Sequence, residues 1–274
     1  SFAEAYTTAA AAYASVLQQG KINAAGIDCG EKARDDFITA LNNCDGSAEC
    51  IETLKNTLSN DFSQCFVKLS DHDSEKLKSC LAQLDDVRKQ FSSLVQSSLE
   101  QLLASAVRPR LKSTIDLFLD ETHTPSEAEF AEMEASDVFV QQLVTVLDSV
   151  LNVFKAFLNQ SVYNSFLEIV AGSVAVDLEK VILNATYNRL GGLVLDKQIR
   201  GLSAYWTTVA SWCLREKFSR LSQVVSLLNV ESVVDAEGFY KSTSLAWLLS
   251  PTEIKQVLAL RVDLPGNDIR QLVL

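Results

Sequence analysis

Apolar residues recur every three or four positions along most of this chain, and strict alternation of apolar and polar residues is missing. Such spacing gathers the apolar side chains on one face of a helix. Residues 74–106 show it most clearly, with a stripe that runs from Leu77 to Leu102. The same spacing predicts helices over residues 2–19, 31–41, 48–69, 138–158, 162–183 and 196–229. The pattern therefore predicts an all-α fold, built as an elongated helical bundle.

Turn-forming residues are few, with 10 Gly and 4 Pro among 274 residues, and they mark the expected breaks. Residues 42–46 are typical of a turn, and Pro109 is expected to kink a long helix. The acidic stretch 121–137 is expected to be a solvated loop with a short helical turn. The pair Gly191-Gly192 predicts a tight corner between two helices, because glycine favours turns.

A boundary is expected near residue 230, because helical spacing is lost over residues 231–244. Beyond it, Ser250-Pro251-Thr252-Glu253 is typical of a helix start, with Ser as the N-cap and Glu at the third position. A turn at Pro265-Gly266 and a last short helix follow. The sequence thus predicts a main helical bundle over residues 1–230 and a small C-terminal helical module over residues 231–274.

The formal net charge of −11 is unevenly spread. Residues 1–160 hold 24 acids and 13 bases, whereas residues 161–274 hold 11 of each. An acidic first half repels phosphate backbones and anionic lipids, so we expect no nucleic-acid partner. The neutral second half is the part that a protein partner could approach without a like-charge penalty.

The six cysteines include no CxxC pair, and a chain of this length can build a core without disulfides, so free thiols of a cytosolic protein are expected. The chain begins at Ser1, so it can be a fragment. Residues 2–17 lack the basic start of a signal peptide. No run of 18 apolar residues occurs, so no transmembrane segment is expected.

Residues for catalysis are scarce in this sequence. His72 and His123 are the whole set of imidazoles, and both are expected to be solvated. Zinc motifs with two or three histidines, the GxSxG motif and glycine-rich phosphate loops are missing. We therefore expect no catalytic residue, no metal and no cofactor, and a protein that is not an enzyme.

Arg220 is predicted to lie on an apolar stripe. At 100° per residue it falls within about 20° of Val209 on a continuous helix. A cation in such a place needs a carboxylate, because an unpaired buried charge is costly. Glu216, one turn earlier, and Glu253, in the C-terminal module, are the candidates. We predict a structural ion pair between Arg220 and Glu253.

The glycine corner and its charged neighbours form a candidate partner surface. An ordinary interhelical corner is the alternative. The three tryptophans are candidate anchors for a partner. Trp206 is assigned to the core by its stripe, and Trp212 is left open. The predicted surface consists of Arg189, Gly191, Gly192, Asp196, Lys197 and Arg200.

Four sequence blocks carry a resemblance: VRPRLKSTIDLFLD (107–120), VAVDLEKVILNATYNRLGGL (174–193), LDKQIRGLSAYWTTVASWCLREKFSRLSQ (195–223) and LSPTEIKQVLALRVD (249–263). With these blocks the chain resembles the C-terminal part of the fourth-subunit family of the conserved oligomeric Golgi complex. The resemblance covers roughly residues 107–274.

The resemblance implies a structural subunit of a multisubunit vesicle-tethering complex built from helical rods. Such a subunit acts in intra-Golgi retrograde traffic and supports normal glycosylation. It is cytoplasmic and lies peripherally on the cytosolic face of the Golgi membrane, which it reaches through partners. Other subunits of the complex are the implied partners, with SNARE machinery as a further candidate. The alternative is an unrelated cytosolic helical adaptor.

Overall fold

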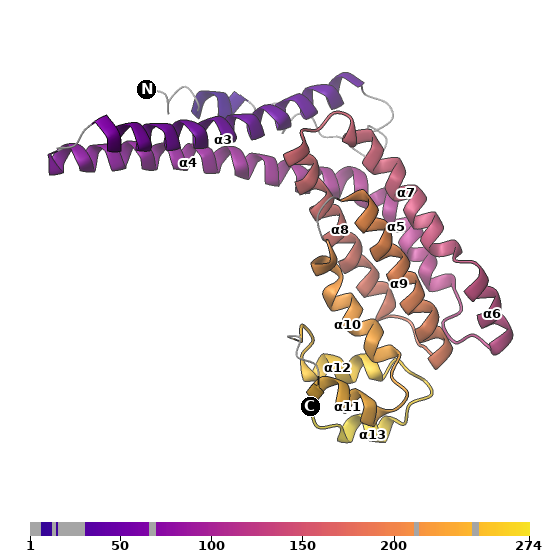
Figure 1. The fold of residues 1–274 in the computed structure, drawn as a ribbon. Coiled ribbons are helices and arrows are strands. Elements are labelled where there is room, and N and C mark those ends of the chain that lie inside the picture. The colour runs from indigo at the N-terminus through magenta and orange to yellow at the C-terminus, as the bar shows by residue number, and fades with distance from the viewer. Residues whose placement is uncertain (1–6, 13–14, 16–30, 66–69, 211–213, 243–246) are drawn as a thin grey trace. The chain divides into compact units, whose positions relative to one another are not determined.

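The computed structural model describes residues 7–12, 15, 31–65, 70–210, 214–242 and 247–274. These residues form helices joined by short connections, with no strand among them beyond one isolated bridge between Tyr187 and Arg261 (Figure 1). The predicted all-α class is confirmed. The chain divides into two compact units, residues 1–109 with 151–169 and residues 110–150 with 170–274.

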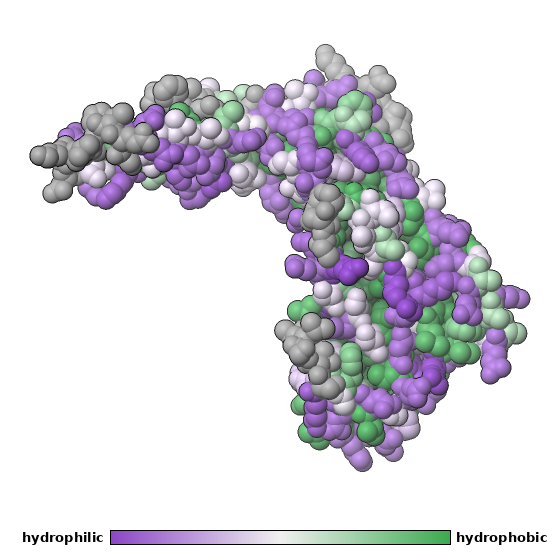
Figure 2. Space-filling view, viewed as in Figure 1, coloured by the Kyte–Doolittle hydropathy of each residue, from purple (hydrophilic) through white to green (hydrophobic). Residues whose placement is uncertain are grey.

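Unit 1 is built on a hairpin of two long helices, α3 (Glu31–Cys65) and α4 (Asp71–Leu102), which pack along each other (Figure 1). Ion pairs cross the hairpin from Lys55 to Asp85 at 3.2 Å and from Arg88 to Glu52 at 2.9 Å. In the view of Figure 2, hydrophilic residues cover much of the hairpin. The buried apolar side chains of the hairpin include Phe37, Leu41, Ile51, Phe91 and Leu99.

The turn predicted at residues 42–46 is wrong, because α3 runs through it without interruption. The polar residues that favour a turn make tertiary contacts instead. The Asn42 amide donates to the Phe157 carbonyl at 2.8 Å, and its oxygen accepts from the Asn159 backbone N–H at 2.9 Å. Asp45 accepts from the Ser161 hydroxyl at 3.0 Å.

Pro109 lies near the start of α5 (Arg108–Asp116), directly after a π-helical turn, η1 (Leu103–Val107). Proline has no N–H for the helix and its ring collides with the carbonyl four residues earlier. A wider turn before it accommodates both effects. The expected disturbance therefore takes the form of a π-helical turn, and helix resumes at once.

Unit 2 continues through η2 (Leu117–Asp120), α6 (Glu127–Ala135), α7 (Val138–Lys155), α8 (Gln160–Ile182) and α9 (Arg189–Val209), where α7 and α8 also enter unit 1. The acidic stretch forms a full helix, α6, opened by a capping box between Ser126 and Glu129, and α6 buries none of its residues. The core of the unit includes Phe118, Phe139, Leu143, Leu178, Leu202 and Trp206.

One stretch of the described residues, Glu127–Lys155, is long and apolar enough to cross a membrane by length and composition alone. The core helix of a globular protein passes the same test. The apolar side chains Leu143, Leu147 and Phe154 of α7 are buried inside the protein.

The end of unit 2 consists of η3 (Arg215–Phe218), α10 (Ser219–Leu228), α11 (Val233–Ser242), α12 (Pro251–Leu258) and α13 (Gly266–Gln271). The helix start predicted at Ser250 is confirmed, with the complete capping box. Helix α11 forms within residues 231–244, although helical spacing is lost there in the sequence. Residues 231–274 belong to the same compact unit as α9 and α10, and the domain boundary at residue 230 stays a prediction.

Candidate functional site

Arg220, in the first turn of α10, joins three parts of unit 2. Its Nε donates to Glu179 Oε1 on α8 at 2.8 Å, and its Nη2 donates to Glu253 Oε1 on α12 at 2.5 Å. Its Nη1 donates to the backbone carbonyl of Leu248 at 2.8 Å. One guanidinium therefore connects α8, α10 and the segment that leads into α12.

Glu253 uses its two oxygens for different purposes. Oε1 accepts from Arg220, and Oε2 accepts from the Ser250 backbone N–H at 2.8 Å and hydroxyl at 2.7 Å. The hydrogen bond from Arg220, followed by those from Ser250, lowers the pKa of Glu253 to about 2. The same two carboxylates raise the pKa of Arg220, with Glu253 the larger cause.

Water reaches this cluster, because the side chains of Arg220 and Glu253 are 35% and 37% exposed and that of Glu179 is 17% exposed. Removing one partner of an ion pair costs less where water reaches the pair than where the pair is fully buried. The cluster therefore fixes geometry more than it adds stability.

The structure brings Arg220 and Glu253 together, although the helix count that led to the pair does not hold. Helix α9 ends at Val209, and Ala210 is extended, so Arg220 does not continue the helical stripe of Val209. The competing Glu216 makes no described contact with Arg220. Glu179 was missed, because no local spacing links residues 41 positions apart.

The prediction of an exposed corner at Gly191-Gly192 is wrong, because both glycines are buried in the first turn of α9. A Cβ at Gly191 would lie 1.8 Å from the His123 carbonyl oxygen, and one at Gly192 would lie 2.5 Å from that of Leu228. Neither has a positive φ. The two glycines allow the backbone of α9 to approach the carbonyls of His123 and Leu228 closely. The Asn188 side chain caps the helix by accepting a hydrogen bond from the Gly191 N–H at 2.8 Å.

The charged residues of the predicted surface fall into two groups. Arg189 is exposed and pairs with Glu231 at 2.5 Å, and Arg200 is exposed and pairs with Asp196 on the next turn. Lys197 donates to the carbonyls of residues 133 and 134 and so caps the end of α6. Asp196 and Arg200 each lie within about 20° of Arg189 around the helix axis, so the three share one face, whereas Lys197 is part of the packing. Partner binding by this face stays a prediction.

Arg261 is the centre of a buried hydrogen-bonded cluster that the sequence did not predict. Its Nη1 donates to the carbonyls of Leu228 at 2.5 Å and Val230 at 3.0 Å, at the end of α10, and its Nε and Nη2 bind Asp263 at 2.7 and 3.0 Å. Beside it, Tyr187 N–H donates to Leu260 O at 2.8 Å, and Tyr187 O accepts from residue 262 at 2.9 Å. Only the Arg-x-Asp spacing is visible in the sequence.

His123 is half-buried, which corrects the expectation of a solvated side chain; His72 is exposed. The His123 Nε2 binds the Phe118 carbonyl at 2.7 Å, and the ring stacks on Phe118 with centroids 4.3 Å apart. Burial lowers the pKa of His123. Among the residues described, no group of three His, Cys, Asp or Glu side chains could hold a metal ion.

The remaining expectations concern tryptophans and cysteines. Trp206 is buried in the core, as predicted, and Trp212 lies outside the described residues. Cys44, Cys50 and Cys80 are free thiols, and burial raises the pKa of Cys44 to about 11.

Long helices, joined by clusters of charged side chains and by caps on backbone ends, define an all-α helical-bundle protein. The chain belongs to the family "Conserved oligomeric Golgi complex subunit 4, C-terminal", whose model matches residues 37–256. The resemblance found in the sequence is thereby confirmed, and the match reaches further towards the N-terminus than the four blocks.

Relatives with the name "Conserved oligomeric Golgi complex subunit 4" are similar over most of the chain. The identity is 42% over 262 residues in Mus musculus, where the match covers 94% of this chain and 33% of the relative. It is 36% over 276 residues in Drosophila melanogaster, covering 98% and 35%, and 32% over 246 residues in Arabidopsis thaliana, covering 89% and 33%. The chain spans about a third of the length of these relatives.

Proposed function

We propose that this chain is part of a structural subunit of a multisubunit vesicle-tethering complex at the Golgi. In this role it supports intra-Golgi retrograde traffic and normal glycosylation. The observation that carries the proposal is the family match over residues 37–256. Relatives from animals and a plant have a name that places them in an oligomeric Golgi complex.

The proposed mode of action is binding, with no catalytic step. The other subunits of the complex are the proposed partners, and SNARE machinery is a further candidate. The proposed location is the cytosolic face of the Golgi membrane, which the subunit reaches through its partners. The clusters around Arg220 and Arg261 support a mode of action without catalysis. Their charged groups bind one another and backbone carbonyls within unit 2.

The test is replacement of the subunit in cells that lack their own copy. A full-length subunit that carries this chain is expected to co-purify with the other subunits of the complex, as read by mass spectrometry. It is also expected to restore cell-surface glycans, as read by lectin binding. Purification without any other subunit of the complex would favour the adaptor alternative.

A further inference from the structure

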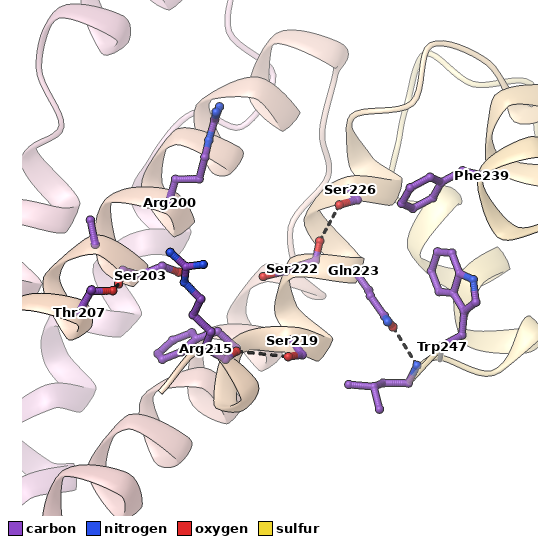
Figure 3. A pocket seen from close by; sticks show the side chains of 13 residues that line it. Arg200, Ser203, Thr207, Arg215, Ser219, Ser222, Gln223, Ser226, Phe239 and Trp247 are labelled. Atoms are coloured by element: carbon purple, nitrogen blue, oxygen red, sulfur yellow. Dashed lines mark hydrogen bonds between the residues drawn. The ribbon is translucent and has the colours of Figure 1, made fainter. Parts of the chain in front are cut away.

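Unit 2 contains an open groove between α9, α10 and the segment around residue 247, with a volume of about 730 Å³ (Figure 3). Short side chains form its floor. Ser203, Ala204 and Thr207 line it from α9, and Ser219, Ser222 and Ser226 line it from α10.

Three hydroxyls of the floor already donate to backbone carbonyls. Thr207 donates to Ser203 O at 2.9 Å, and Ser226 donates to Ser222 O at 2.9 Å. Ser219 donates to Arg215 O at 3.2 Å. An occupant therefore meets a floor of small, uncharged side chains, against which a backbone can approach closely.

One side of the groove is apolar. Phe239 and Trp247 meet edge to face, with ring centroids 5.3 Å apart, and the Trp247 indole N–H donates to Tyr240 O at 3.2 Å. Leu248 is 51% exposed and Phe239 is 37% exposed, so both present apolar surface to solvent. Partner anchors of this kind are typical of binding sites.

This apolar side is fixed in place by α10. The Leu248 backbone N–H donates to Gln223 Oε1 at 2.9 Å, and its carbonyl accepts from Arg220 Nη1 at 2.8 Å. Both backbone polar groups of Leu248 are thus occupied, and the side chains of Trp247 and Leu248 line the groove. A preformed wall lowers the entropic cost of binding.

The opposite side is basic. Arg200 and Arg215 line the groove from α9 and η3, and no acid occurs among its described lining residues (Figure 3). The segments 211–213 and 243–246, which flank it in the sequence, contain no Asp or Glu. Arg200 already pairs with Asp196, so Arg215 is the principal cation offered to an occupant. A basic site on a chain of net charge −11 is a local feature.

We propose that this groove binds a short acidic peptide segment of a partner protein. A bulky apolar side chain of the segment packs on Phe239, Trp247 and Leu248, and a carboxylate of the segment pairs with Arg215. Charge complementarity selects the acidic occupant, and the groove's size and mainly apolar wall suit a peptide side chain. The inference goes beyond the proposed tethering function and does not depend on it.

The test selects peptides from a random library displayed on phage, against the purified 274-residue chain. Enriched peptides are expected to combine Asp or Glu with Leu, Phe or Trp. An enriched peptide is then synthesised, and its Kd is measured by fluorescence anisotropy. Enrichment of basic peptides, or no enrichment, would overturn the proposal.

Variants locate the binding. Ser222 is exposed on the floor, so Ser222→Trp fills the groove and is expected to abolish binding. Arg215→Glu is expected to raise Kd about fivefold, the upper end of the effect of losing one exposed ion pair. Lys217→Glu is the matched control, since Lys217 is exposed on η3 and does not line the groove.

Circular dichroism of each variant confirms its fold, and Arg215→Glu keeps the test valid if Ser222→Trp misfolds. Equal weakening by Arg215→Glu and Lys217→Glu would show diffuse electrostatic attraction and overturn the proposal. Self-association of the chain in sedimentation, abolished by Ser222→Trp, would assign the groove to a second copy and also overturn it. Failure of these tests with intact glycan rescue would leave the tethering function in place.

Discussion

At the scale of single residues, two substitutions can separate the contributions of the contacts that join Arg220 and Glu253. Glu253→Gln keeps an amide that can still complete the capping box with Ser250, but it removes the charge that faces Arg220. Arg220→Met removes all three donors. The two substitutions therefore separate helix capping from the link between α10 and α12.

A double-mutant cycle with Arg220→Met and Glu253→Gln is expected to give a coupling free energy that is clearly above zero. It should be smaller than for a fully buried pair, because water reaches both side chains. Denaturant unfolding supplies the measurement. Arg215→Met, an exposed neighbour, is the control and should change stability less. Coupling within error of zero would show that the pair is only a geometric contact.

Acid is expected to weaken unit 2 in a defined pH window. The pKa of Glu253 is lowered from 4.5 to about 2 in the folded protein, so the folded state binds its proton less readily than the unfolded chain. This stabilisation is complete above about pH 4.5 and is lost as the pH falls towards 2. Thermal unfolding between pH 7 and pH 2 measures it. The difference in Tm between wild type and Glu253→Gln should shrink in that window; a constant difference would contradict the assignment.

Arg189 offers a test of the predicted binding face of α9. Its side chain is exposed and its pair with Glu231 is in water, so Arg189→Glu should change Tm little. If the face binds another subunit, the variant should co-purify less of that subunit with the full-length protein. Lys241→Glu, on α11, reverses another exposed charge and serves as a control. Undiminished co-purification and glycan rescue would remove Arg189 from the surface.

At the scale of elements, the buried start of α9 is expected to reject any side chain. Gly191→Ala should destabilise the protein by about 3 kcal/mol or more, because a backbone carbonyl occupies the place of the methyl group. Gly172→Ala in α8 is the matched control. A Cβ there has nothing within 4 Å, so it should stabilise by about 0.5–1 kcal/mol. Similar effects of the two substitutions in denaturant unfolding would refute the close approach.

The sequence predicted those helices whose formation depends on local sequence signals. Apolar periodicity located α4, α7 and α8, and the capping signature located α12. It failed where distant contacts decide. Residues 42–46 stay helical, and Asn42 donates a hydrogen bond to the Phe157 carbonyl. Position 191 requires glycine because the carbonyl of His123 lies where a Cβ would be. The pairing of Arg220 with Glu253 could be anticipated from the need of a cation for a carboxylate. The contact of Arg220 with Glu179 and the hydrogen bonds of Arg261 depend on the tertiary fold.

At the scale of the whole molecule, residues 231–274 are expected to be needed for the stability of unit 2. Their removal leaves the carbonyls of Leu228 and Val230 without Arg261 and Tyr187 without its bridge. Removal also exposes to water the apolar side chains with which α10 packs against α12. A chain of residues 1–230 should therefore show a lower Tm and faster amide exchange in α9 and α10. Arg261→Met in the full chain should show part of this effect; unchanged exchange after truncation would support an independent bundle.

The two carboxylate oxygens of Glu253 have different partners, and this couples two steps of folding. One oxygen completes the first turn of α12 and the other fixes that turn to α10, so the carboxylate is best satisfied only when both have formed. The start of the helix and its attachment are thus thermodynamically coupled through a single group. The first turn of α12 should gain order upon docking and lose it upon release, as one cooperative opening event.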